Sequence, residues 1–219
     1  MANNLANADH WVSVTISLLN LGCHNMSSSH ALSQQIQFLK EIDQLKSVVR
    51  KSPLIDQSRK ENSAEHSWHL AMYALILKDT ADESINIERV IKMLLIHDIV
   101  EIDAGDHPIH ETGDNSTQEA TEQAAADRIF GLLPTEQGTE LKSLWYEFEA
   151  AESADARFAK SLDRLQPLVH NIETQGGTWV EGKVSKEQVI SRYGSVISKG
   201  SKALWQVASK WVESHFSNR

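Results

Sequence analysis

The chain has 219 residues, with 21 Lys and Arg against 30 Asp and Glu, so its formal net charge at pH 7 is −9. Hydrophobic residues make up 41% and charged residues 23% of the chain, which excludes a disordered or fibrous protein and suits one globular domain. The acidic balance disfavours a nucleic-acid polymer as partner, because proteins that bind one gather Lys and Arg against its phosphates.

The first thirty residues are weakly patterned and end in three serines that follow Met26. We expect residues 1–30 to be an extension outside the main domain. Met26 could serve as a second start site, so residues 1–25 are expected to be either poorly ordered or an upstream mis-start.

From residue 32 onward the apolar residues recur at helical spacing. The pattern predicts a helix with one buried face over Leu32–Val49, which Pro53 ends or follows. The polar stretch Leu54–Asn62 predicts a loop. Ser63 is placed to cap the next helix, which carries on one face His66, Leu70, Tyr73 and Leu77.

Asn86 is a suitable cap for a helix over 87–103, which stops by Gly105 and leads into a polar loop over about 104–115. No alternating pattern predicts a strand of useful length. We therefore expect an all-α, single-domain helical bundle, with residues 31–180 as its main part and 181–219 as C-terminal helices packed on it. Further helices are predicted over 116–131, 135–151 and 154–173, near 185–192 and near 199–216.

Cys23 is the only cysteine, which excludes an intrachain disulfide and a cysteine-based zinc finger. The longest apolar run, Leu70–Leu77, has eight residues, whereas a membrane-spanning helix needs about 20. The N-terminus lacks the basic and then apolar order of a signal peptide. We expect a cytoplasmic protein with no membrane partner.

The helix predicted over 87–103 changes character along its buried face. Its apolar stripe is followed on the same face by His97, Asp98 and Glu101, since a helix turns about 100° per residue. Burying carboxylates costs several kcal/mol unless they are paired or bind a cation. No Lys or Arg lies within one turn on that face, so either a divalent cation binds there or the helix end emerges into solvent.

Two further polar residues border buried faces of other predicted helices. A histidine such as His66 in a core is usually just hydrogen-bonded. Asp163 could simply form an ion pair with Arg164, Arg157 or Lys160. Together with His97 and Asp98, however, they supply two imidazoles and two carboxylates from three helices. This set suits Mn²⁺, Co²⁺, Fe²⁺, Ni²⁺ or Zn²⁺, and it leaves coordination positions for water and substrate, as catalytic sites do.

The segments around these residues read RKENSAEHSWHLAMYA, RVIKMLLIHDIVEIDAGD and RFAKSLDRLQPLVHN. In this order they resemble the HD-domain superfamily of metal-dependent phosphohydrolases, and within it the bacterial branch that includes 5′-deoxynucleotidases. The resemblance covers about residues 32–180. It implies one divalent metal ion bound by His66, His97, Asp98 and Asp163.

The resemblance also implies that Glu101 and Asp106 are catalytic carboxylates near the attacking water and the substrate. In the deoxynucleotidases an Arg about fifteen residues before the first His orients the phosphate, followed there by Trp; here the pair is Arg50 and Lys51. Because a phosphate monoester carries about −1.5 to −2 charge, cations just before the His66 helix are substrate-binding candidates. These are Arg50, Lys51, Arg59 and Lys60, of which Arg59 and Lys60 could instead belong to a solvated loop.

The expected reaction is hydrolysis of a phosphate monoester by metal-activated water, with a (deoxy)nucleoside 5′-monophosphate as the leading substrate. Two alternatives remain open: an HD hydrolase of a diester or non-nucleotide phosphate, and a metal-bound regulatory module without catalysis. One metal is favoured over two, because the remaining candidates, His107 and His110, lie in one short loop. A homodimer is possible if the last helix packs on a second subunit.

Overall fold

The computed structural model describes residues 28–107 and 115–217. These parts of the chain are built of helices and one two-stranded sheet, so the predicted helical fold is confirmed. None of the described helices is both long and apolar enough to cross a membrane. After a first helix over 28–42, the elements are the 3₁₀ turn Asp43–Ser47, β1 (Val49–Pro53), β2 (Lys60–Asn62), α2 (Ser63–Leu77), the 3₁₀ turn Lys78–Thr80, α3 (Ile87–Ile96), α4 (Glu101–Ala104), α5 (Asn115–Phe130), α6 (Thr135–Ala150), α7 (Ala154–Glu173), α8 (Gly177–Glu181), α9 (Lys186–Val189), the π turn Ile190–Gly194, α10 (Ser195–Gly200) and α11 (Lys202–Ser217).

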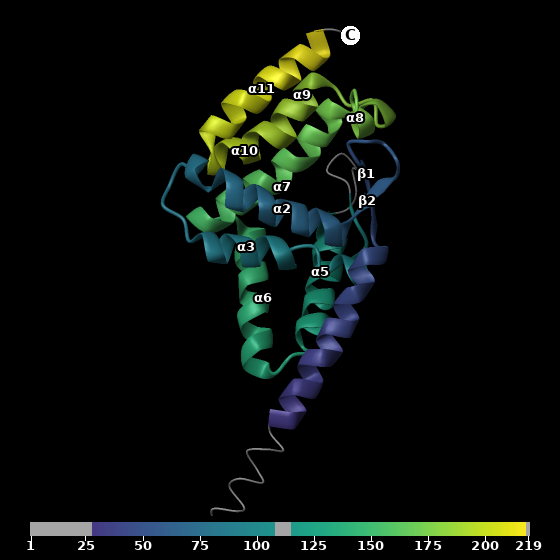
Figure 1. Cartoon of the computed structure of the whole chain (residues 1–219), viewed down its shortest axis with the longest axis vertical. Coiled ribbons are helices and arrows are strands. Elements are labelled where there is room, and N and C mark those ends of the chain that lie inside the picture. The colour runs from purple at the N-terminus through teal and green to yellow at the C-terminus, as the bar shows by residue number, and fades with distance from the viewer. Residues whose placement is uncertain (1–27, 108–114, 218–219) are drawn as a thin grey trace, which may run out of the picture.

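The helix α7 lies at the centre of the molecule and packs against α2, α3, α6 and α10 (Figure 1). The C-terminal helices α8 to α11 gather at one end of the molecule. The first helix, α5 and α6 extend towards the other end (Figure 1). Every predicted metal ligand therefore lies on α2, on α7 or directly after α3, in the central part of the molecule.

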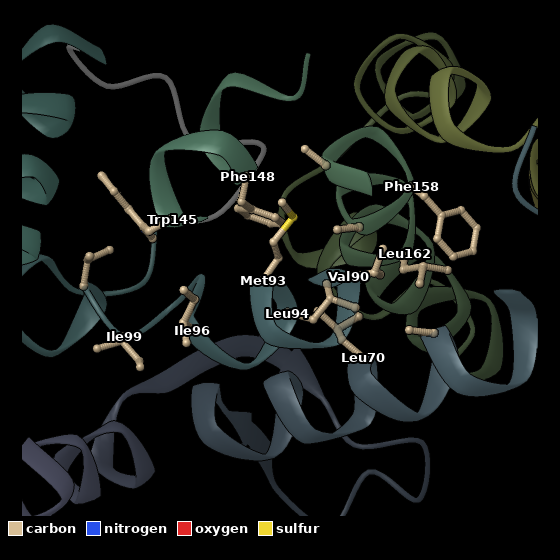
Figure 2. Close-up of a cluster of buried hydrophobic side chains, with 14 of the residues drawn as sticks. Leu70, Val90, Met93, Leu94, Ile96, Ile99, Trp145, Phe148, Phe158 and Leu162 are labelled. Carbon is tan, nitrogen blue, oxygen red and sulfur yellow. The ribbon is translucent and has the colours of Figure 1, made fainter. Parts of the chain in front are cut away.

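The core beneath the site is formed where α2, α3, α6 and α7 meet (Figure 2). Leu70 of α2, Leu94 of α3 and Leu162 of α7 are completely buried there, and burial of each such side chain contributes about 1.5–3 kcal/mol. Asp163 directly follows Leu162, and His97 lies three residues after Leu94. The apolar packing therefore holds these two polar residues at the edge of the core.

The first predicted helix ends earlier than expected. A helix up to Val49 and a loop throughout Leu54–Asn62 were both wrong in part, because β1 pairs antiparallel with β2, with Val49 opposite Asn62 and Pro53 opposite Lys60. Strands of five and three residues are too short to show an alternating pattern. The sheet matters for the site because Arg50 and Lys51 lie on β1.

The start of α2 lies one residue from the predicted cap. Asn62, rather than Ser63, is the N-cap: its side chain accepts a hydrogen bond from Glu65 N, and the Glu65 carboxylate accepts one from Asn62 N. This capping box satisfies two donors that a helix N-terminus would otherwise leave open. The cap leaves the Ser63 hydroxyl available for another contact, which lies in the site.

Candidate metal centre

The continuous helix predicted over 87–103 is interrupted in the structure, and the interruption shapes the site. Asn86 caps α3 as predicted, but α3 ends at Ile96 and α4 begins only at Glu101. Between them Glu101 N donates to Asp98 O at 3.0 Å, a bond that spans three residues rather than four. Residues three apart are aligned in such a turn, so Asp98 and Glu101 lie on one side of the chain.

Four buried side chains converge where α2, α7 and the turn after α3 meet. His66 Nε2 lies 3.2 Å from Asp163 Oδ1 and 3.9 Å from Asp98 Oδ2. His97 Nε2 lies 2.9 Å from Asp98 Oδ1 and 3.5 Å from Asp163 Oδ1. Two imidazole nitrogens and two carboxylates thus face one common point, as the sequence analysis expected for a cation site.

The protonation of His97 tests whether these residues suit a cation. His97 Nδ1 lies 2.9 Å from the carbonyl oxygen of Leu94, which can only accept, so Nδ1 carries a proton. Nε2 is buried and has no hydrogen-bond partner among the described residues, although it faces two carboxylates. A lone pair aimed at carboxylate oxygens is stable only with a cation between them, so the donor set fits a divalent metal ion.

The same electrostatics explain the titration of His97 without a metal. Burial alone lowers its pKa, but the negative charges of Asp98 and Asp163 outweigh burial and raise the pKa to about 10. In the metal-free protein a proton on Nε2 therefore takes the place of the cation. A metal ion would have to displace that proton.

Both carboxylates of the cluster remain ionised despite their burial. Burial raises the pKa of Asp98, but His97 and Arg50 outweigh it and lower the pKa to about 2. Asp163 is held well below its usual pKa chiefly by Arg164, whose Nη1 donates to Asp163 Oδ2 at 2.6 Å. The two negative charges match one divalent ion.

Arg50 reaches from β1 into the middle of the acidic residues. Its Nη1 donates to Asp98 Oδ2 at 2.8 Å and lies 3.6 Å from Asp106 Oδ1 and 3.9 Å from Glu101 Oε1. The Ser63 hydroxyl donates to Glu101 Oε2 at 2.5 Å. The structure therefore brings the predicted phosphate-binding Arg50 and both predicted catalytic carboxylates beside the two histidines and two aspartates that are predicted to bind a metal ion.

A cavity of about 470 Å³ opens over this cluster, a volume within the range of small-molecule sites. Lys51 lines it, whereas Arg59 does not: Arg59 lies on the surface and donates two hydrogen bonds to Glu65, at 2.5 and 2.8 Å. His107 lines the cavity as well, and His110 lies outside the described residues. The charged and polar wall also includes Lys160, Arg164 and Tyr193. The sequence analysis considered Arg164 only as an ion-pair partner of Asp163, which it is, and did not place these three residues in the cavity wall.

A second group of possible metal ligands lies behind His66 and was also missed. It consists of Glu61, His69 and His170, whose ligand atoms approach one another closely. The amide nitrogen of Gln166 already lies among them, 2.6 Å from Glu61 Oε1, 3.4 Å from His69 Nδ1 and 3.1 Å from His170 Nε2. The group is therefore a hydrogen-bonding centre around one amide rather than a second metal site.

Comparisons with known proteins agree with this geometry. The family model described as HD domain matches residues 42–205 of the chain. The human protein named 5′-deoxynucleotidase HDDC2 is 31% identical over 147 residues, which cover 67% of this chain and 71% of that protein. The fission yeast 5′-deoxynucleotidase hdd1, from Schizosaccharomyces pombe, is 27% identical over 77% of this chain and 82% of its own length.

A solved structure is still more similar. The crystal structure of a predicted metal-dependent phosphohydrolase from Magnetospirillum magnetotacticum is 51% identical in sequence and superposes with a TM-score of 0.82. The match covers 85% of this chain and 93% of that one. A conserved hypothetical protein from Pyrococcus furiosus, 23% identical with a TM-score of 0.52 over 75% of this chain and 97% of its own, shares the fold.

Replacing Glu101 by Gln should stabilise the metal-free protein. Burial and the charge of Asp98 raise the pKa of Glu101 in the folded state to about 9, against 4.5 as the ordinary value. Between these pH values the unfolded chain loses the proton first, so the wild-type free energy of unfolding falls as pH rises. We expect Glu101→Gln to be more stable by about 1–3 kcal/mol at pH 8, measured by urea denaturation with chelator.

The exposed Glu140 of α6 provides the matched control, and Glu140→Gln should leave the free energy of unfolding within about 0.5 kcal/mol of wild type. The advantage of Glu101→Gln should disappear at pH 4. Equal stability of wild type and Glu101→Gln at pH 8 would contradict the burial of an ionisable Glu101 beside Asp98.

Proposed function

This chain belongs to the HD-domain family, and we propose that it hydrolyses the phosphate monoester of nucleoside 5′-monophosphates, with deoxyribonucleotides as the preferred class. The observation that carries the proposal is a two-His, two-Asp cluster beside Arg50, whose side chain is 12% exposed, with a cavity of about 470 Å³ opening over them. The names of the relatives at 27–31% identity support the substrate class.

One divalent metal ion is part of the proposal. It would be held by His66, His97, Asp98 and Asp163, and the mixed nitrogen and oxygen donors suit Mn²⁺, Co²⁺, Fe²⁺, Ni²⁺ or Zn²⁺. When bound, such an ion polarises a phosphate oxygen and makes a coordinated water more acidic.

The residues of the chain itself would bind the substrate and move its protons. The pKa of Arg50 is raised, because the attraction of Asp98, Asp106 and Glu101 outweighs burial, so its guanidinium stays charged. A planar guanidinium matches a phosphate with two parallel hydrogen bonds. Lys51, on the same strand, lines the cavity and adds positive charge to its wall.

Glu101 is placed to handle the proton of the attacking water. Its Oε2 is fixed by the Ser63 hydroxyl at 2.5 Å, which leaves Oε1 directed towards Arg50 and the cavity. Besides burial, the charge of Asp98 raises the pKa of Glu101. Because a bound divalent ion would balance that charge, Glu101 would then be ionised, accept the proton from water and return it to the leaving oxygen. Asp106 Oδ1 lies 3.6 Å from Arg50 Nη1 and helps to hold the guanidinium in place.

We further propose a homodimer in the cytoplasm. Large apolar side chains exposed on α2, above all Trp68 at 62% and Ile76 at 74%, would be covered by a second subunit. Val207 and Trp211 of α11 are partly exposed as well. With Cys23 as its only cysteine, the chain has no intrachain disulfide of the kind that oxidising compartments favour.

Phosphate release from a panel of ribo- and deoxyribonucleoside 5′-monophosphates tests the activity. After treatment with chelator the protein should be inactive, and added Mn²⁺ or Co²⁺ should restore release, fastest from deoxyribonucleotides. Glu101→Gln should keep its metal content but lose about 10²-fold or more in turnover, as expected for removal of a general acid–base group.

Metal-dependent release from diesters or non-nucleotide phosphates alone would replace the proposed substrate. Metal binding without turnover of any phosphate ester would identify a regulatory module instead.

Two arginines on the same hairpin provide a matched pair for the phosphate contact. Arg50→Gln should lower kcat/KM by about 10- to 100-fold, since a hydrogen bond to a charged group contributes about 1.5–3 kcal/mol. Arg59→Gln should leave kcat/KM unchanged, because Arg59 contacts Glu65 on the surface. Steady-state kinetics with the best deoxyribonucleotide measures both, and equal losses in the two variants would contradict the assignment of Arg50.

A further inference from the structure

Glu61 of β2 and Gln166 of α7 lie directly behind His66, on the side away from the cavity. Glu61 is 2% exposed and Gln166 is completely buried, and neither lines the cavity. They are 105 residues apart in the chain, yet Gln166 Nε2 donates to Glu61 Oε1 at 2.6 Å. Burying a carboxylate and an amide costs more free energy than burying two apolar side chains, which suggests that this pair has a role.

The hydrogen bonds around Gln166 leave its amide only one orientation. A carboxylate can only accept, so the nitrogen of the amide must face Glu61. His170 agrees: its Nδ1 donates to the carbonyl oxygen of Pro53 at 3.1 Å, which leaves its Nε2 as an acceptor 3.1 Å from the same amide nitrogen. The amide oxygen of Gln166 therefore points away from Glu61.

That oxygen lies 3.1 Å from His66 Nδ1. Since an amide oxygen can only accept, Nδ1 of His66 must carry a proton. The second oxygen of Glu61 lies 3.4 Å from the same Nδ1 and favours the same proton. The opposite nitrogen of His66, Nε2, is the one that faces Asp163 and Asp98, the two carboxylates of the proposed metal site.

We propose that Glu61 and Gln166 are positioning residues that hold the proton of His66 on Nδ1, so that Nε2 presents its lone pair to the metal ion. The inference rests on the proposed metal site, to which it adds two residues that touch neither metal nor substrate. Partners of this kind orient the ring of a ligating histidine and strengthen its binding.

The two histidines of the cluster obtain the same tautomer by different means. His97 donates from Nδ1 to the backbone oxygen of Leu94, a partner that no substitution removes. His66 depends on the side chains of Gln166 and Glu61, which substitutions do remove. Glu61 Oε2 also lies 3.6 Å from Arg50 Nε. The same carboxylate therefore contacts both a proposed metal ligand, His66, and the residue proposed to bind phosphate, Arg50.

The affinity of the full-length protein for Co²⁺ tests the inference without reliance on activity. Gln166→Met keeps the length of the side chain but removes both its donor and its acceptor. We expect Gln166→Met and Glu61→Gln to bind Co²⁺ about 10- to 100-fold more weakly than wild type. Binding is followed by the visible absorption of the cobalt, with circular dichroism to show that each variant is folded.

Ser161→Ala is the matched control, because Ser161 is a completely buried polar residue of the same helix whose hydroxyl donates to the backbone of that helix, at Phe158 O. It should bind Co²⁺ as wild type does. Wild-type affinity in both Gln166→Met and Glu61→Gln would overturn the inference while the metal site itself stood. A wild-type protein that binds no Co²⁺ would overturn the proposed function and, with it, this inference.

The tautomer of His66 can also be observed in the wild-type protein, so this test does not require a variant to fold correctly. In metal-free wild type, nitrogen-15 NMR of labelled histidines should show a slowly exchanging proton on Nδ1 of His66. Gln166→Met should lose that slow exchange, whereas Ser161→Ala should keep it. An unprotonated Nδ1 in the wild type would overturn the inference.

Discussion

The burial of two ionised carboxylates, Asp98 and Asp163, is the constraint to which the rest of the site responds. Each needs positive charge or hydrogen-bond donors close by, because an isolated buried carboxylate is too costly to remain ionised. Arg164 compensates Asp163 and Arg50 compensates Asp98, while the two imidazoles lie between them. The imidazole nitrogens and carboxylate oxygens that face one another in this arrangement are suited to bind one divalent ion together.

This constraint explains the small sheet in an otherwise helical protein. Arg50 can reach Asp98 only because β1 passes beside the turn that follows α3, and β1 is held there by its pairing with β2. The same pairing brings Glu61 of β2 behind His66. Eight strand residues thus deliver the cation expected to bind phosphate and the carboxylate that orients a metal ligand.

Much of the architecture could be predicted from the sequence, because it depends on local periodicity and capping. The bounds of α7 and the Asn86 cap of α3 follow directly from those signals. The break after Ile96 could not be predicted, since no Gly or Pro marks it. The four-residue turn 97–100 is stabilised by a tertiary contact, the hydrogen bond from Trp145 Nε1 to His97 O. The sheet was missed because its strands are too short to show a pattern.

In the site, too, only the features that depend on local sequence patterns or on the family resemblance could be predicted. The convergence of His66, His97, Asp98 and Asp163 was expected from their places on helix faces and from the family resemblance, and their role as ligands stays a prediction. Charge and position alone could not distinguish Arg50 from Arg59, because both lie shortly before His66, and only the family resemblance favoured Arg50. Only the hairpin separates them, by turning one inward and leaving the other on the surface. Glu61 and Gln166 had no sequence signal, since their contact spans 105 residues.

The proposed site and function depend on the position of the metal ion. X-ray diffraction at the cobalt absorption edge, from crystals soaked in Co²⁺, locates the ion directly. We expect one anomalous peak, bound by His66, His97, Asp98 and Asp163. A peak among Glu61, His69 and His170 would contradict this position, because the metal ion would have to displace the Gln166 amide that lies among them. Saturating Co²⁺ with no peak at the four predicted ligands would contradict it equally.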